Sequence, residues 1–190
     1  AIAEHPRYAH AYWLRSDANA YLYRFGPSAM DMTRACLCDP QCTTRVYRKF
    51  TGSRGGLRAR LAPLMLPALD QEDAGDACAS LAKGFLAGFT GNHARGLKET
   101  EAALVSAPGT PAALAWKGWM LHRLGRDDEA EEALGQADTA CKGMQVVSYF
   151  RACILASRGD LDAARKLLDA APELEDAAKE ESDLRDLRKR

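Results

Sequence analysis

The distribution of apolar and polar positions along the chain predicts helices throughout. The stretch LGRDDEAEEALGQADTA, at residues 124–140, places alanine and leucine on one side of a helix and acidic residues on the other. Similar stretches stand upstream, FTGNHARGLKETEAALVSAP, and downstream, SRGDLDAARKLLDAAPE. Runs of valine, isoleucine and threonine that alternate with polar residues are absent, so strands have little to form from. We therefore expect an all-α protein.

These amphipathic stretches recur with a fixed period. Gly91, Gly125 and Gly159 follow one another at intervals of 34 residues. Such a glycine is expected to end the first helix of a hairpin in the left-handed conformation. Small residues at constant offsets from the glycines are expected where two helices cross closely: they include Gly84, Gly118, Ala130 and Ala164. A constant period of this length is typical of stacked helical hairpins.

Residues 77–178 resemble the tetratricopeptide repeat family. The three matching segments begin DACASLAKGFLAGF, TPAALAWKGWMLHR and MQVVSYFRACILAS, and Pro108 stands where the family has its proline between repeats. The resemblance implies an α-solenoid of antiparallel helix hairpins, with repeats at 77–110, 111–144 and 145–178. It also implies a protein that binds other proteins and is not an enzyme.

In this family the first helix of each repeat lines a concave inner face that contacts the partner. The resemblance places predominantly aromatic and apolar residues there, with two polar ones for orientation. The residues that we expect to contact a partner are Phe85, Phe89, Trp116, Trp119, His122, Arg123, Tyr149 and Phe150. Such a lining favours an apolar or helical peptide segment, held as in helix-in-groove recognition.

Several occupants of the concave face stay open at this stage. An adaptor would bind one partner segment, and a chaperone-like assembly factor would hold hydrophobic client segments more broadly. A structural module would instead fill the face itself, either with the N-terminal stretch that carries Tyr8, Tyr12 and Trp13 or with a second subunit in a homodimer. A small molecule or lipid is a further alternative.

The segments on either side of the repeats lack the 34-residue register. The pattern of residues 1–76 also predicts helices, with breaks at Gly26-Pro27 and Asp39-Pro40. We expect this region to form two degenerate hairpins or a separate helical cap. Residues 179–190 are strongly charged and predict a cap helix or a tail.

Candidate chemistry is sparse. No nucleophile elbow, nucleotide-binding glycine loop or histidine pair with metal spacing occurs, so no catalytic residue and no cofactor is assigned. Cys36, Cys38 and Cys42 are close together, but a structural zinc site normally needs four ligands. We expect unpaired thiols, with a disulfide and, more remotely, a metal site as alternatives.

Charge gives no argument for an anionic partner. The sequence has 26 lysines and arginines and 26 aspartates and glutamates, so we expect neither nucleic acid nor a charged membrane surface as a partner. No apolar run approaches the roughly 20 residues of a membrane span. We expect a cytoplasmic protein, with a periplasmic or lipid-anchored one as alternatives, because any leader would precede Ala1.

Overall fold

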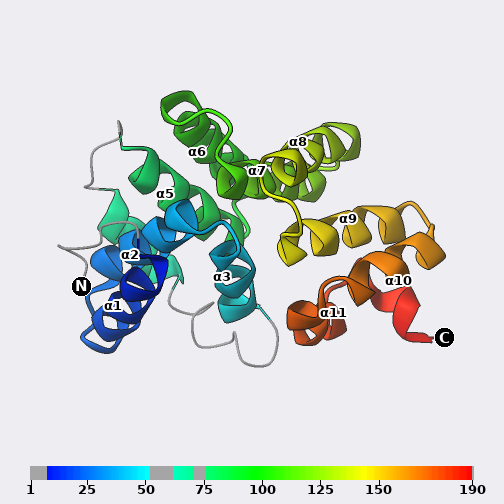
Figure 1. Ribbon diagram of the computed structural model, residues 1–190, viewed down its shortest axis with the longest axis horizontal. Coiled ribbons are helices and arrows are strands. Elements are labelled where there is room, and N and C mark those ends of the chain that lie inside the picture. Colours follow the sequence, from blue (N-terminus) through cyan, green and yellow to red (C-terminus); the bar gives the residue numbers. More distant parts are fainter. Residues whose placement is uncertain (1–7, 52–61, 71–75, 190) are drawn as a thin grey trace.

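The computed structural model describes residues 8–51, 62–70 and 76–189, and the regular elements in these ranges are all helical (Figure 1). The all-α prediction is therefore confirmed for this part of the chain. The helices are α1 (Ala9–Tyr21), α2 (Phe25–Cys38), α3 (Cys42–Phe50), a helix over 62–69, α5 (Ala77–Phe89), α6 (His93–Ser106), α7 (Pro111–Arg123), α8 (Asp127–Ala140), α9 (Gln145–Ser157), α10 (Leu161–Asp169), η1 (Pro172–Leu174), α11 (Glu175–Glu180) and η2 (Arg185–Lys189).

Three hairpins, α5–α6, α7–α8 and α9–α10, follow one another around an arc (Figure 1). Gly91, Gly125 and Gly159 end the first helix of each with φ of +83°, +75° and +85°, the left-handed region that favours glycine. The amide after each glycine then donates back to a carbonyl in the last turn of the helix, as Asn92 does to Ala87 at 2.9 Å. This is the Schellman arrangement, and it turns the chain directly into the second helix.

Small residues stand where the two helices of a hairpin cross. A Cβ atom on Gly84 would lie 3.2 Å from the Gly96 carbonyl oxygen and 3.2 Å from the Thr100 amide nitrogen, both in the backbone of α6. A Cβ atom on Gly118 would lie 3.2 Å from the Ala130 carbonyl oxygen in α8. Helices this close leave no room for a side chain, which explains the regular offsets of small residues in the sequence.

The first helical pair breaks at a different point from the one that the sequence indicates. The turn between α1 and α2 lies at residues 22–24, where Tyr23 adopts a φ of +57°. Gly26 and Pro27 fall in the first turn of α2 instead of interrupting a helix. Proline is tolerated there because the amide that it lacks has no intrahelical acceptor in the first turn. The predicted break at Asp39-Pro40 matches the end of α2 at Cys38.

Helix α3 lies in the hollow of this array of three hairpins (Figure 1). It contacts α5 at one end through the stacked rings of Phe50 and Phe89, and it contacts α9 and η1 at the other end. The Val146 amide at the start of α9 donates to the Thr44 hydroxyl at 3.2 Å, and Arg48 pairs with Glu173 of η1 at 3.1 Å. The chain after α10 also turns back on the array, where Leu174 and Leu184 are buried. Ala177 is buried as well, and we call residues 172–187 the C-terminal cap.

Candidate functional site

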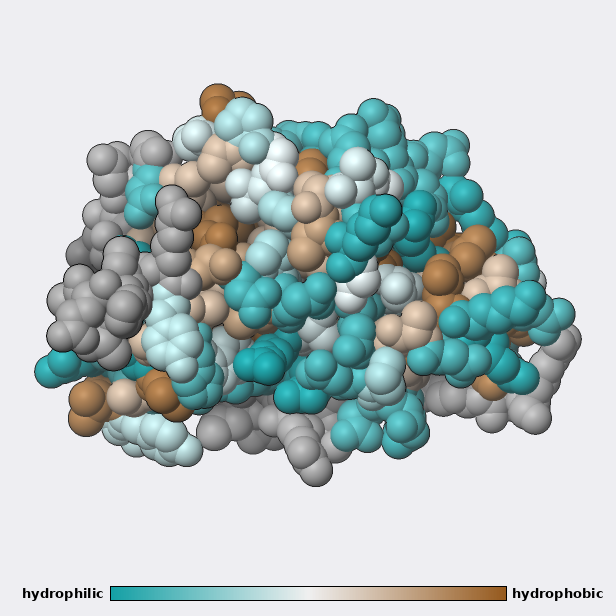
Figure 2. All heavy atoms as spheres, in the orientation of Figure 1, coloured by the Kyte–Doolittle hydropathy of each residue, from teal (hydrophilic) through white to brown (hydrophobic). Residues whose placement is uncertain are grey.

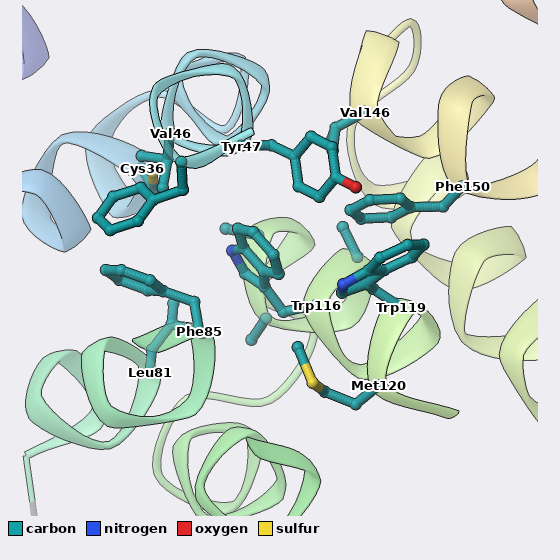
Figure 3. Packing of buried hydrophobic residues seen from close by; sticks show 14 of the residues in the cluster. Cys36, Val46, Tyr47, Leu81, Phe85, Trp116, Trp119, Met120, Val146 and Phe150 are labelled. Carbon is teal, nitrogen blue, oxygen red and sulfur yellow. The ribbon is translucent and has the colours of Figure 1, made fainter. Parts of the chain in front are cut away.

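The first helices of the three hairpins, α5, α7 and α9, face α3 in the hollow of the arc, and we call this side the concave face. Its aromatic side chains meet in one cluster (Figure 3). Trp119 stacks on Phe150 with ring centroids 4.6 Å apart, and Trp116 lies 5.9 Å from Phe85 and 6.0 Å from Phe150. Phe85, Trp116 and Phe150 are at most 2% exposed. The structure therefore brings the predicted residues together but covers most of their surface.

Helix α3 covers these aromatic residues, and its Tyr47 ring lies at the centre of the cluster (Figure 3). The Tyr47 ring is 1% exposed and lies among five other aromatic rings, at centroid distances of 5.0–6.0 Å. Phe50, one helical turn later, stacks on Phe89 at 4.6 Å. Arg45 and Arg48 on the opposite side of α3 are exposed, so this short helix is clearly amphipathic.

The segment that fills the face is thus different from the N-terminal stretch considered above. Tyr8 is half-exposed, and the Trp13 ring lies 4.0 Å from the Lys49 ammonium on α3. The signal in the sequence was the stretch VYRKF, in which apolar residues recur at helical spacing and basic residues lie between them. It was missed because residues 42–50 stand outside the 34-residue register.

Two neighbouring cavities remain between α3 and the C-terminal cap, and we call them together the slot. The larger has a volume of about 290 Å³ and is lined by Tyr47, Phe50, Thr51, Gly88, Phe89, Gly91, His93, Trp119, Arg123 and Glu181. The smaller, of about 200 Å³, is lined by Tyr47, Thr51, Tyr149, Ala177, Glu180 and Glu181. Tyr47, Thr51 and Glu181 line both cavities, so the two adjoin. Four of the predicted partner-binding residues, Phe89, Trp119, Arg123 and Tyr149, line the slot.

Two of the residues that line the slot have a buried polar atom without a hydrogen-bond partner. The buried Nδ1 atom of His93 and the buried hydroxyl of Tyr149 have no hydrogen-bond partner. Burial, followed by the charge of Arg123, lowers the pKa of His93, which keeps this imidazole neutral at physiological pH. Arg123 itself pairs with Glu181 and Asp183, each at 3.3 Å, and lies over the Trp119 ring.

A larger hollow, of about 630 Å³, lies between the loop at Gly109 and helix α8. Its lining includes Leu114, Gly135 and Thr139, and it holds neither aromatic rings nor buried polar groups without partners. The slot, whose lining has both, is therefore the better candidate for a binding site.

His122 has a different position from the one expected for a partner contact. Its imidazole is buried, with Nδ1 2.7 Å from Asp127 and Nε2 3.1 Å from Asp183. Burial would lower the pKa of His122, but the hydrogen bonds to Asp183 and Asp127 outweigh it and raise the pKa above its ordinary 6.5. The same hydrogen bond lowers the pKa of Asp183. His122 thus fastens the C-terminal cap to α7 and α8.

This fastening predicts a pH-dependent stability. A histidine whose pKa is higher in the folded than in the unfolded state stabilises the fold fully below its unfolded pKa and loses that effect as the pH rises through its folded pKa. We expect the contribution of His122 to be complete below about pH 6.5 and to be lost progressively as the pH rises from there through the raised folded pKa, at up to about 1.4 kcal/mol per pH unit. The contribution of Asp183 should be present above pH 3.8 and fall on acidification below it.

Urea unfolding of the wild type and of His122→Gln at about pH 5.5 and about pH 9 measures this effect. The stability difference between the two proteins should be larger at the lower pH. An equal difference at both pH values would show that His122 stabilises the cap only by packing.

The clustered cysteines are free thiols in the structure, as are the other three. Burial raises the pKa of Cys36, and burial together with the charge of Asp39 raises the pKa of Cys42 to about 11. A thiol that stays protonated is a poor nucleophile and a poor metal ligand. Among the described residues, no group of three or more histidines, cysteines and acids is placed to hold a metal ion.

The described helices have the fold of an α-solenoid of antiparallel helix hairpins, similar to that of tetratricopeptide repeat proteins. Similar solved structures are two of MamA, each 16% identical with a TM-score of 0.53. They cover 91% and 86% of this chain and 95% and 96% of their own. A third is YrrB, described as a TPR protein with an unusual peptide-binding site, at 15% identity, a TM-score of 0.52, and coverage of 100% of this chain and 96% of its own.

No family model and no curated protein matches the sequence. Among the described helices, none is both long and apolar enough to cross a membrane.

Proposed function

We propose that the protein is a non-enzymatic interaction scaffold that binds a segment of a partner protein in the slot, with α3 remaining in place as one wall. The observation that carries this proposal is the slot itself, where aromatic rings and polar groups without partners line the uncovered part of the concave face. Pockets of this kind, mostly apolar with a few convergent polar groups, are typical binding sites. The YrrB likeness, whose description names an unusual peptide-binding site, agrees with it.

A partner that displaced α3 would have to replace the free energy with which α3 packs on the array. Val46, Tyr47 and Phe50 are at most 3% exposed. Burying each of three such side chains is worth about 2 kcal/mol, so together they stabilise α3 by roughly 6 kcal/mol. An incoming helix would lose about four orders of magnitude in affinity to this competition. Binding beside α3 avoids that loss, which favours the slot over the whole aromatic face.

The covered face also favours an adaptor over a chaperone-like factor. On the face shown in Figure 2, hydrophobic residues lie among hydrophilic ones, and the aromatic rings of the concave face are mostly buried under α3. Broad binding of hydrophobic client segments needs an extended apolar surface. A slot with two small cavities instead suits one or two side chains of a particular segment. If no segment binds, the protein is instead a structural module that fills its own concave face or forms a homodimer.

Thr51→Trp tests the proposal because Thr51 lines both cavities and is only partly buried. Peptides selected from a random displayed library on the wild-type protein should lose about 30-fold in affinity for this variant, which corresponds to roughly 2 kcal/mol. Isothermal titration calorimetry with the selected synthetic peptides measures the loss. Trp119→Ala is a poorer test, because the stacked Trp119 ring is part of the core.

Val105→Trp is the matched control, since Val105 is 82% exposed on α6 and lines neither cavity. It should bind the selected peptides like the wild type. The proposal is wrong if the library yields no specific peptide, or if the selected peptides bind Thr51→Trp as tightly as the wild type.

A further inference from the structure

The smaller cavity of the slot lies between two tyrosines on one side and two glutamates on the other. Tyr47, Thr51 and Tyr149 line it on the side of α3 and α9, and Ala177, Glu180 and Glu181 line it on the side of the C-terminal cap. Its volume of about 200 Å³ is below the roughly 300–1,000 Å³ of pockets that take a whole drug-sized ligand. A cavity of this size suits a single side chain.

The hydroxyl of Tyr149 points to the kind of group that this cavity takes. Tyr149 is 0% exposed, and its hydroxyl has no partner at full hydrogen-bond geometry; the Tyr47 hydroxyl and the Cys153 thiol interact with it only at longer range. Buried polar atoms in folded proteins nearly always have a partner, so a hydroxyl without full hydrogen-bond geometry in a residue that lines a cavity is a candidate acceptor for a guest. A phenol oxygen accepts a hydrogen bond from an ammonium or guanidinium group.

The charges around the cavity select a cation. Glu180 and Glu181 bring two carboxylates, and no lysine or arginine is among the described residues that line the cavity. Arg123 pairs with Glu181 from the larger cavity, whereas Glu180 is exposed and makes no ion pair with a described residue. An anion here would meet two like charges, and an apolar group would leave the Tyr149 hydroxyl unpaired.

We propose that the smaller cavity binds the ammonium or guanidinium of a lysine or arginine in the segment that occupies the slot, with Tyr149 and Glu180 accepting its hydrogen bonds. This inference rests on the proposed function and adds the chemistry of the partner. The rings of Tyr47 and Tyr149, whose centroids are 5.3 Å apart, add cation–π attraction where the cation reaches a ring face. The larger cavity, walled by Phe50, Phe89 and Trp119, then takes a neighbouring apolar side chain.

The first experiment uses the lysine side chain alone as a probe. N-acetyl-lysine amide is titrated into the ¹⁵N-labelled full-length protein, and the expected result is saturable shifts at Tyr149, Glu180 and Glu181. A dissociation constant of about 1–10 mM is expected for a ligand of this size. N-acetyl-norleucine amide, which has the same chain length without the charge, should cause no such shifts. Equal binding of the two probes would overturn the inference.

Two variants assign the contacts. Glu180→Gln and Tyr149→Phe should each weaken the lysine probe by about tenfold, since each removes an acceptor for a charged donor. Tyr149→Phe keeps the ring and removes a hydroxyl that has no partner, so it is expected to fold. Glu175→Gln, on the same short helix but paired with Lys179 outside the cavity, is the control and should bind normally. Unchanged binding by both test variants would disprove the site.

The selected peptides separate this inference from the proposed function. Slot-binding peptides should carry a basic residue next to an apolar one. If they bind the slot without a basic residue, or if free spermidine binds the cavity far more tightly than both the lysine probe and these peptides, the cation inference is wrong and the scaffold function stands. If no peptide binds the slot, the proposed function fails, and the probe titration alone decides whether the cavity takes a cation.

Discussion

Replacing Tyr47 with alanine is expected to lower the free energy of unfolding by about 3–5 kcal/mol, the range for removing a large aromatic side chain from a core. The reason is the position of the ring, which is 1% exposed and lies among five other aromatic side chains. A folded domain has only about 5–15 kcal/mol of stability in total, so this one substitution should remove a large share. Chemical denaturation followed by circular dichroism measures the change.

Tyr21→Ala is the control for this prediction. Tyr21 is 85% exposed at the end of α1, so the same substitution there should change stability by less than about 0.5 kcal/mol. A loss of less than about 1 kcal/mol in Tyr47→Ala would mean that α3 rests on the array without stabilising it. In that case a partner helix could replace α3, and the argument for the slot would be lost.

A second large effect is expected from Gly84→Val. The new side chain would begin 2.5 Å from the Thr100 hydroxyl and 3.2 Å from two backbone atoms of α6, so α5 and α6 would have to separate. Overpacking of this kind costs about 1–3 kcal/mol, and we expect the upper end because backbone atoms cannot rotate away as side chains can. Thermal or urea unfolding of the purified variant would show the loss.

Gly135→Val is the matched control, because Gly135 also lies inside a helix, α8, but a Cβ atom added there would have only the Arg151 guanidinium nearby, at 4.0 Å. Valine is a slightly better helix former than glycine, so this variant should match or exceed the wild type by up to about 0.5 kcal/mol. If Gly84→Val were equally stable, close helix crossing would not be the reason for a small residue at position 84.

The array could be predicted from the sequence because its signals are local and repeated. A turn glycine and a small residue at a helix crossing each leave one identifiable position, and the 34-residue period multiplies weak positions into a clear pattern. The helical class and the similarity to tetratricopeptide repeat structures are confirmed. The division into three repeats at the stated boundaries stays a prediction, although the hairpins α5–α6, α7–α8 and α9–α10 fall within those ranges.

The candidate site was harder to predict because its state depends on a contact between distant segments. Nothing near Trp116 or Phe150 in the sequence indicates that Tyr47 covers them, since the two contacts join residues 69 and 103 positions apart. An aromatic row on the first helices has the same sequence pattern whether it faces a partner or another part of the chain. The slot was beyond prediction for the same reason, because α3 and the C-terminal cap form its walls.

The bridge that α3 makes between the two ends of the array has a consequence for folding. In an open repeat array each unit touches only its neighbours, so the ends fray and the units can unfold one after another. Here Phe50 of α3 stacks on Phe89 of α5 at one end of the array. At the other end, the Arg48–Glu173 ion pair and the Thr44–Val146 hydrogen bond join residues 125 and 102 positions apart. Such contacts raise the contact order, which slows folding, and they link the two ends in a single cooperative transition. The protein should therefore tolerate the loss of a terminal hairpin less well than an open solenoid of the same length.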